Sequence, residues 1–286
     1  GVWKTVLIGS LGRGGNTIFA IDVTDMSNFD ETKILWEFSH PELGIILGKP
    51  QIVRLLNGKW SVVVGNGYNS ASEKPELFII DIETGNLTKK ITAGDELLAG
   101  NNGISTPLVV DTNGDFISDL IYAGDLKGNL WKFNLDSSSP DSWNMAFAGS
   151  PLYTALGPSG ATQPITSKPV IAKHPEGGFM VVFGTGRFFS QGDEIIPAEG
   201  PNINTLYGIR DLGTSVPSVG SRNLPPNTQP DVILQPQSIE TEEIEVSSGV
   251  TNTIRIISNN SIDFKGGGGK APQQGLSLIH ISEPTR

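Results

Sequence analysis

The sequence contains no cysteine in 286 residues and only three histidines. Without cysteine there is no disulfide framework, no thiolate zinc site and no cysteine nucleophile. Basic residues are also few, because 20 lysines and arginines face 30 aspartates and glutamates, for a formal net charge of −10. Nucleic acids select basic surfaces, so we expect no nucleic-acid partner. No apolar run approaches the roughly 20 residues that span a bilayer, so we expect no transmembrane segment in this chain.

Turn-forming residues, by contrast, are abundant. The chain has 35 glycines and 19 prolines, while charged residues make up only 17%, against roughly 25% in ordinary globular domains. Turn formers placed between short branched runs are typical of an all-β chain.

Four apolar runs that each end in glycine organise the first 212 residues, and their glycines are 56, 59 and 60 residues apart. These runs are Val6–Gly9, Val62–Gly65, Leu120–Gly124 and Val181–Gly184. Each is followed by a turn and a second run with an aromatic residue in register, namely Phe19, Phe78, Trp131 and Tyr207. Proline opens an earlier strand in three of the repeats, at Pro50, Pro107 and Pro169. Further strands are expected at Ile34–Phe38 and, more weakly, Leu87–Thr92.

Four short antiparallel strands in each repeat of this length describe the blade of a β-propeller. We therefore predict an all-β fold, a partial propeller of about four blades over residues 1–212, whose first blade lacks the proline-opened strand. The aromatic residues in register are expected to pack between blades. A β-sandwich with accidental periodicity is the alternative architecture.

The two ends of the chain depart from the repeat. Residues 213–275 are interpreted as an inter-blade excursion or the start of a further blade, with one strand expected at Thr253–Ile257. Residues 276–286 read LSLIHISEPTR, which resembles a translated sequencing adapter, so we expect an artefact there; the alternative is an ordinary strand. Because the chain begins at Gly1, we expect a truncated or processed start.

One loop carries a pattern suited to metal binding. Oxygen side chains occupy positions 1, 3, 5 and 9 of residues 111–119, and position 7 can supply its carbonyl; the predicted ligands are Asp111, Asn113, Asp115, Ile117 and Asp119. Calcium prefers six to eight oxygen ligands, so a tight loop with alternating oxygens predicts a Ca²⁺ site. The loop departs from an EF-hand, because Phe116 stands where that loop has glycine and Tyr122 where it has the bidentate glutamate. The alternative is a polar turn without metal.

Other motifs carry less chemistry. The glycine-rich segments at residues 12–15 and 184–187 join strands rather than opening helices, so hairpin turns are favoured over phosphate loops. His40 and His174 lie beside prolines without a local serine or carboxylate constellation. The sequence therefore predicts no catalytic triad.

Several of these segments together resemble the C-terminal propeller of the PilC/PilY family of type IV pilus biogenesis proteins. They are residues 48–53, 57–70 and 122–133, continuing through Phe183–Phe188, and the resemblance covers roughly residues 1–260. In that family the calcium loop lies between the first two strands of a blade, and its ligand pattern matches Asp111, Asn113, Asp115, the Ile117 carbonyl and Asp119.

The resemblance implies a non-enzymatic pilus factor at the cell surface or fimbrium, associated with the outer membrane or passing through the periplasm. Its calcium occupancy is expected to bias pilus extension against retraction. The resemblance further implies roles in twitching motility and adhesion, with minor pilins, the pilus assembly machinery and host or surface receptors as partners. Two alternatives stay open. One is an extracellular ligand- or carbohydrate-binding propeller, and the other is a quinone-dependent dehydrogenase.

Overall fold

The computed structural model describes residues 3–27, 29–95, 100–157, 160–175, 177–193 and 204–214. It describes the backbone alone of the strands at 234–237, 239–247, 250–257 and 275–279. The chain forms two compact units, the first made of Gly1–Leu152 with Ile165–Pro169 and the second of Tyr153–Pro164 with Val170–Arg286. The described residues form β-strands and short 3₁₀ helices, among them η1 (Gly12–Gly14), η2 (Glu31–Lys33) and η4 (Pro140–Ser142), and none of their helices is long and apolar enough to cross a membrane.

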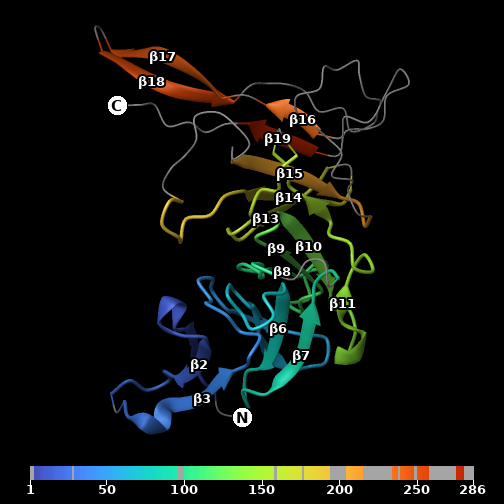
Figure 1. Cartoon of the computed structure of the whole chain (residues 1–286). Coiled ribbons are helices and arrows are strands. Elements are labelled where there is room, and N and C mark those ends of the chain that lie inside the picture. The colour runs from blue at the N-terminus through green and yellow to red at the C-terminus, as the bar shows by residue number, and fades with distance from the viewer. Residues whose placement is uncertain are drawn as a thin grey trace. The chain divides into compact units, whose positions relative to one another are not determined.

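Three antiparallel sheets make up the first unit, coloured blue, teal and green in Figure 1. The first has the strand order β1 (Val6–Ser10), β2 (Thr17–Asp22), β3 (Ile34–Ser39). The second has the order β4 (Gln51–Arg54), β5 (Trp60–Gly65), β6 (Glu76–Asp81), β7 (Leu87–Thr92). In the third, β8 (Leu108–Val110), β9 (Leu120–Gly124), β10 (Asn129–Asn134) and β11 (Asn144–Met145) follow one another.

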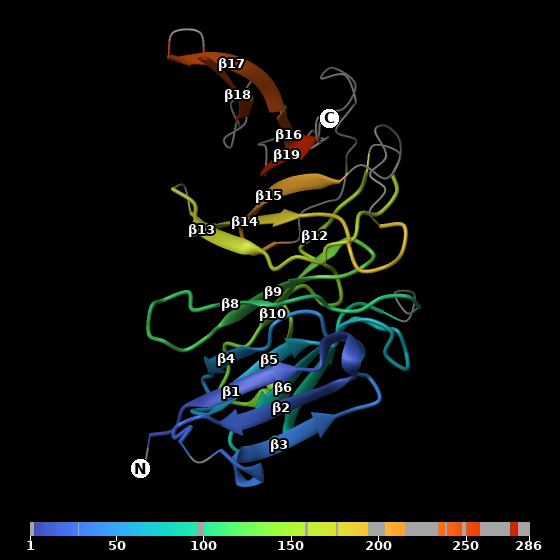
Figure 2. The same ribbon diagram turned by 90° about the vertical axis from the view of Figure 1, so that its left-hand side faces the viewer.

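These sheets confirm the predicted blades. The strands that proline opens are β4 and β8, and the first sheet has no such strand, as the sequence predicts. The segments expected at 34–38 and 87–92 are the outer strands β3 and β7. Figure 2 shows the strands of these sheets from a second direction.

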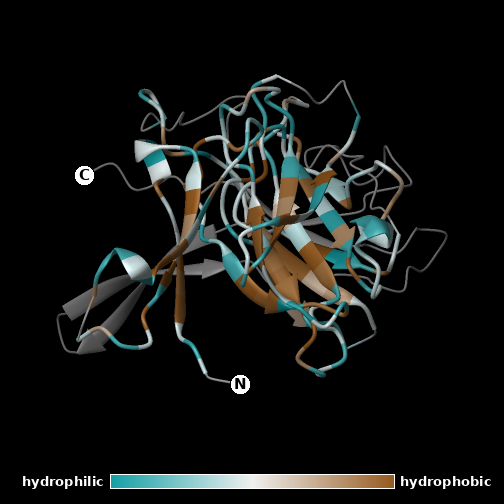
Figure 3. Cartoon of the chain, turned by 90° about the horizontal axis from the view of Figure 1, so that it is seen from below, coloured by the Kyte–Doolittle hydropathy of each residue, from teal (hydrophilic) through white to brown (hydrophobic). Residues whose placement is uncertain are grey.

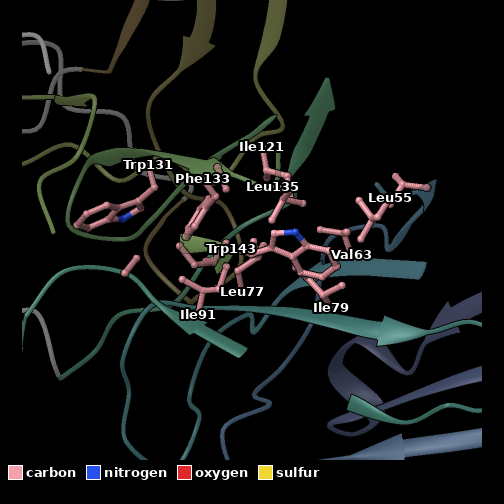
Figure 4. Packing of buried hydrophobic residues seen from close by; sticks show 14 residues of the cluster. Leu55, Val63, Leu77, Ile79, Ile91, Ile121, Trp131, Phe133, Leu135 and Trp143 are labelled. Atoms are coloured by element: carbon pink, nitrogen blue, oxygen red, sulfur yellow. The ribbon is translucent and has the colours of Figure 1, made fainter. Parts of the chain in front are cut away.

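The second sheet is apolar on both faces because it lies between two neighbours. Alternate residues of β5 and β6 take opposite sides, as the period of two requires. Val62, Val64, Phe78 and Ile80 belong to a buried cluster with Ile18, Ala20 and Trp36 of the first sheet. Val63, Leu77 and Ile79 belong to a second buried cluster with Ile121, Trp131 and Phe133 of the third sheet (Figure 4). Figure 3, coloured by hydropathy, shows hydrophobic residues along these strands and more hydrophilic residues in the turns that join them.

The predicted packing role of the aromatic residues is confirmed inside this unit. Phe78 and Trp131 are fully buried, and each lies in a cluster that joins its own sheet to the preceding one. Phe19 occupies the matching face of the first sheet, and its ring lies over Gly9.

The repeat of glycines is less regular than their spacing predicts. Gly65 and Gly124 pair with Leu77 and Leu130, whereas Gly9 pairs with the aromatic Phe19 itself. Strand β1 is thus shifted by one residue relative to its counterparts. The reason is steric, because a Cβ atom on Gly9 would lie 2.4 Å from the Phe19 ring, so the glycine makes room for that ring.

Gly65 and Gly124 have a different role. The segment that leads into the next blade passes directly against the backbone of each of these glycines. A Cβ on Gly65 would lie 2.3 Å from the Ser105 carbonyl oxygen, and one on Gly124 would lie 2.2 Å from Ile165 Cγ2 and 2.6 Å from the Ile165 carbonyl oxygen. Only glycine permits such an approach of backbone to backbone.

The second unit contains the fourth predicted blade. The strands of this blade are β13 (Val170–Lys173), β14 (Phe179–Gly184), β15 (Thr205–Asp211), β16 (Leu234–Gln237) and β19 (Gly275–Ile279), whereas β12 (Tyr153–Thr154) is not part of its sheet. One sheet has the order β13-β14-β15-β19-β16, in which β16 pairs parallel to β19, so this blade departs from the purely antiparallel prediction. Strand β19 falls largely in the segment 276–286 expected to be an artefact. The alternating LSLI sequence of this segment is compatible with a strand, and the strand pairs with β15. Residues 280–286 lie outside the described residues.

A two-stranded ribbon of β17 (Ile239–Ser247) and β18 (Val250–Ile257) occupies part of the region after the repeat. The strand expected at 253–257 lies inside β18. Its partner β17 was not predicted, because the glutamates at 240, 242, 243 and 245 obscure the alternation with isoleucine and threonine.

We expect Gly124→Ala to destabilise the first unit by about 1–3 kcal/mol, since the new methyl group would overpack against the Ile165 backbone. Gly14→Ala is the matched control, because its Cβ would meet only Leu11 Cβ at 4.0 Å; a change within about 0.5 kcal/mol is expected there. Urea denaturation of the two variants measures both values. Equal stabilities would contradict the close-passage role of Gly124.

Candidate metal centre

The predicted calcium loop connects β8 to β9 within the third sheet. The Asp119 amide donates to the Val110 carbonyl at 2.9 Å, which closes the loop at its base. The Ser118 amide donates to the Arg54 carbonyl at the end of β4, and the Leu135 amide donates to the Asp119 carbonyl, at 2.9 and 2.8 Å. The loop is therefore held by the second sheet on one side and by the end of β10 on the other.

Asp111 organises the first half of the loop. Its Oδ1 accepts hydrogen bonds from the amides of Gly114 and Asn113 at 2.6 and 3.2 Å, and its Oδ2 accepts one from the Phe116 amide at 2.8 Å. Partial burial raises the pKa of Asp111, but these backbone donors outweigh it, so the pKa lies below the ordinary aspartate value. Gly114 takes a left-handed φ of +85°, as expected of the residue that makes the turn.

Asn113 and Asp115 form the exposed middle of the loop. The Asp115 amide donates to Asn113 Oδ1 at 2.9 Å, and Asn113 Nδ2 donates to Asp115 Oδ2 at 3.2 Å. The Ile117 amide donates to Asp115 Oδ1 at 2.8 Å. Successive side chains of the loop are thus linked to the backbone two residues on, which is the arrangement of Asx turns.

Asp119 differs from the other acids because it is buried, with 8% of its surface exposed. Its Oδ2 accepts hydrogen bonds from the Thr112 amide at 2.8 Å and the Thr112 hydroxyl at 2.6 Å. Its Oδ1 has no hydrogen-bond partner among the residues that the structure describes. One oxygen of a buried carboxylate thus remains available as a ligand.

The loop of residues 111–119 fits calcium in the chemistry of its donor atoms. All five predicted ligands offer oxygen, which a hard cation prefers, and they lie in one loop of nine residues. Within the described residues, however, no group of three or more histidine, aspartate or glutamate side chains is gathered closely enough to hold a metal ion. Asp111 faces backbone amides and Asp119 faces Thr112, so the loop supplies the donor set without converging it. Thr112, which sequence reasoning missed, holds the predicted ligand Asp119.

A second polar cluster lies in the third sheet, at the turn that joins β9 to β10. Asp125 is fully buried, and its carboxylate accepts side-chain hydrogen bonds from Asn102, Asn129 and Trp131 at 3.1, 2.9 and 2.9 Å. The amides of Lys127 and Asn129 also donate to it, both at 2.9 Å. Sequence spacing does not reveal this cluster, because Asn102 is distant along the chain and its contact with Asp125 is set by packing.

Burial raises the pKa of Asp125, and the hydrogen bonds from Asn129, Trp131 and Asn102 oppose that rise without cancelling it. All of its contacts join segments of one unit. This cluster therefore fastens the start of the third blade to its inner strands and offers no open ligand position.

Comparison with known proteins decides the family. The protein-family model described as the PilY1 beta-propeller domain matches residues 1–229 of this chain. The type IV pilus biogenesis factor PilY1 of Pseudomonas aeruginosa strain PAO1 is 39% identical over 298 residues, covering 97% of this chain.

The chain belongs to the PilY1 β-propeller domain family.

Two further similarities agree with this assignment. A PilY1 homolog from Xylella fastidiosa strain Temecula1 is 40% identical over 232 residues, covering 76% of this chain and 16% of the relative. The crystal structure of the Pseudomonas aeruginosa PilY1 C-terminal domain superposes with a TM-score of 0.81 at 39% identity, covering 98% of this chain and 60% of that one. The chain spans only 25% of the length of the Pseudomonas PilY1, so it corresponds to the propeller part of these relatives.

We expect Asp125→Asn to destabilise the first unit by about 3–5 kcal/mol. The substitution places an amide NH₂ among five donors, which leaves buried donors without an acceptor. Asp136→Asn, at an exposed aspartate outside the cluster, is the control and should change stability by less than about 0.5 kcal/mol. Thermal and urea unfolding of both variants check this, and a fully stable Asp125→Asn protein would show that the cluster is dispensable.

Proposed function

We propose that this chain is the calcium-binding propeller of a type IV pilus biogenesis factor. Membership of the PilY1 β-propeller family supports the pilus role, because relatives that cover nearly all of this chain are named as type IV pilus biogenesis factors. That naming also favours a non-enzymatic role over dehydrogenase chemistry. The observation that supports calcium is the all-oxygen donor set of residues 111–119, with the free Oδ1 of buried Asp119.

Calcium would relieve an electrostatic conflict in the loop. Asp111, Asp115 and Asp119 bring three carboxylates into nine residues, and these repel one another unless a cation lies between them. Asp111, Asn113, Asp115 and Asp119 would hold the ion together with the Ile117 carbonyl. Because Asp119 faces Thr112 in the structure, binding would exchange or share that contact.

The consequence for function is a change in one surface loop. A bound Ca²⁺ would rigidify the loop and remove two negative charges from one face of the blade, and either change alters a docking surface. In this proposal calcium occupancy biases pilus extension against retraction, at the cell surface or fimbrium, and so affects twitching motility and adhesion. The partners are minor pilins, the pilus assembly machinery and host or surface receptors.

We expect the full-length protein to bind one Ca²⁺ at this loop and Asp119→Ala to abolish that binding in titration calorimetry. Asp136→Ala, an exposed acid outside the loop, should bind as the wild type does. At calcium concentrations 100-fold above Kd, binding should stabilise the wild type by about 2.7 kcal/mol. Absence of heat at millimolar calcium, or unchanged binding by Asp119→Ala, would contradict the site.

In the parent organism, Asp119→Ala should change surface piliation and reduce the twitching zone, while Asp136→Ala should not. Protein levels are measured in parallel by immunoblot, because a folded variant is needed for the comparison. Normal pili and normal twitching with a gene deletion would contradict the pilus role altogether. A deletion phenotype together with a fully active Asp119→Ala protein would contradict only the regulation by calcium.

A further inference from the structure

Phe116, at the apex of the loop between β8 and β9, combines two unfavourable features. Its side chain is among the most exposed large hydrophobic groups of the described residues, with 88% of its surface accessible. Its backbone has a φ of +66°, in the left-handed region that strains any residue with a bulky Cβ substituent. Either feature alone costs free energy, and a side chain this exposed adds little to the packing of the blade.

The strained conformation is held in place from both sides. The Phe116 amide donates to Asp111 Oδ2 at 2.8 Å, and the next amide, of Ile117, donates to Asp115 Oδ1 at 2.8 Å. The Ser118 amide then fastens the loop to the Arg54 carbonyl. The residues that display Phe116 therefore include predicted ligands of the calcium site.

Glycine would remove both costs at this position. The same loop uses glycine where it needs a left-handed turn, at Gly114 with a φ of +85°. Locally unfavourable residues that the surroundings hold in a fixed conformation cluster at functional sites. The adjoining turn after β4 adds an apolar group to this end of the blades, because Leu56 is also exposed.

We propose that Phe116 is a docking anchor, which inserts into an apolar pocket of a protein partner in the pilus assembly when calcium holds the loop. The proposal rests on the proposed function and names the contact that the calcium loop would regulate. An aromatic anchor that fills a pocket is the usual centre of a protein interface. With Ca²⁺ bound, the three carboxylates of the loop still leave one negative charge beside the anchor, on a chain of formal net charge −10, so the complementary pocket is edged by lysine or arginine. This residual negative charge repels anionic lipid headgroups and so favours a protein over a membrane.

Phe116→Gly tests the anchor in the full-length protein because it should relieve strain while removing the contact. We expect a melting temperature no lower than that of the wild type and a calcium affinity within twofold of it. We expect twitching in the parent organism to fall to the level of the gene deletion. Phe188→Gly is the matched control, because Phe188 is 80% exposed but lies outside the loop; it should twitch normally.

A second series of variants distinguishes the loss of the apolar contact of Phe116 from a change in its backbone conformation. Phe116→Leu, which keeps an apolar side chain, should retain most twitching, whereas Phe116→Asp should not. If Phe116→Gly accumulates poorly, Phe116→Asn, whose side chain also tolerates a left-handed backbone, takes its place with the same expected loss.

Three outcomes would overturn the anchor. Normal twitching by Phe116→Gly in a strain where Asp119→Ala is defective would reject the anchor and leave the calcium function standing. Normal twitching by both variants and by the gene deletion would reject the anchor together with the proposed function. Calcium-dependent sedimentation of the purified protein with phosphatidylserine vesicles, lost in Phe116→Gly, would replace the protein partner with a membrane.

Discussion

The structure of the first unit depends on the burial of both faces of a sheet against its neighbours. A blade of three or four short strands is too thin to bury its own apolar residues, so each sheet is stable only between others. Val62, Val64 and Phe78 pack toward the first sheet, while Val63 and Ile79 pack toward the third. The glycines that end β5 and β9 then let the connecting chain pass closely enough for this packing.

This packing also explains where the candidate site lies. The strands are rigid because they are buried, and the loop of residues 111–119 emerges from their end with its base fastened by Arg54, Val110 and Leu135. Polar residues that would be costly inside a blade can gather in such a loop at little expense. Exposed Asp115 and Phe116, and buried Asp119, thus belong to one segment with a fixed base.

Much of this organisation could be predicted from the sequence, because strands of period two, proline-opened edges and glycine-ended runs are local signals. Contacts between distant segments could not be predicted. The shift of β1, the pairing of β16 with β19 and the bond from Asn102 to Asp125 all depend on which segments packing brings together. At the candidate site, the spacing of oxygens predicts the ligands but not that Thr112 holds Asp119, since threonine at that position carries no motif.

A crystal structure of the full-length protein grown with calcium would show whether the loop of residues 111–119 binds the ion. We expect one Ca²⁺ at about 2.3–2.6 Å from oxygens of Asp111, Asn113, Asp115, Asp119 and the Ile117 carbonyl. A structure at millimolar calcium with no ion in the loop, and with Asp119 still bonded only to Thr112, would contradict this expectation.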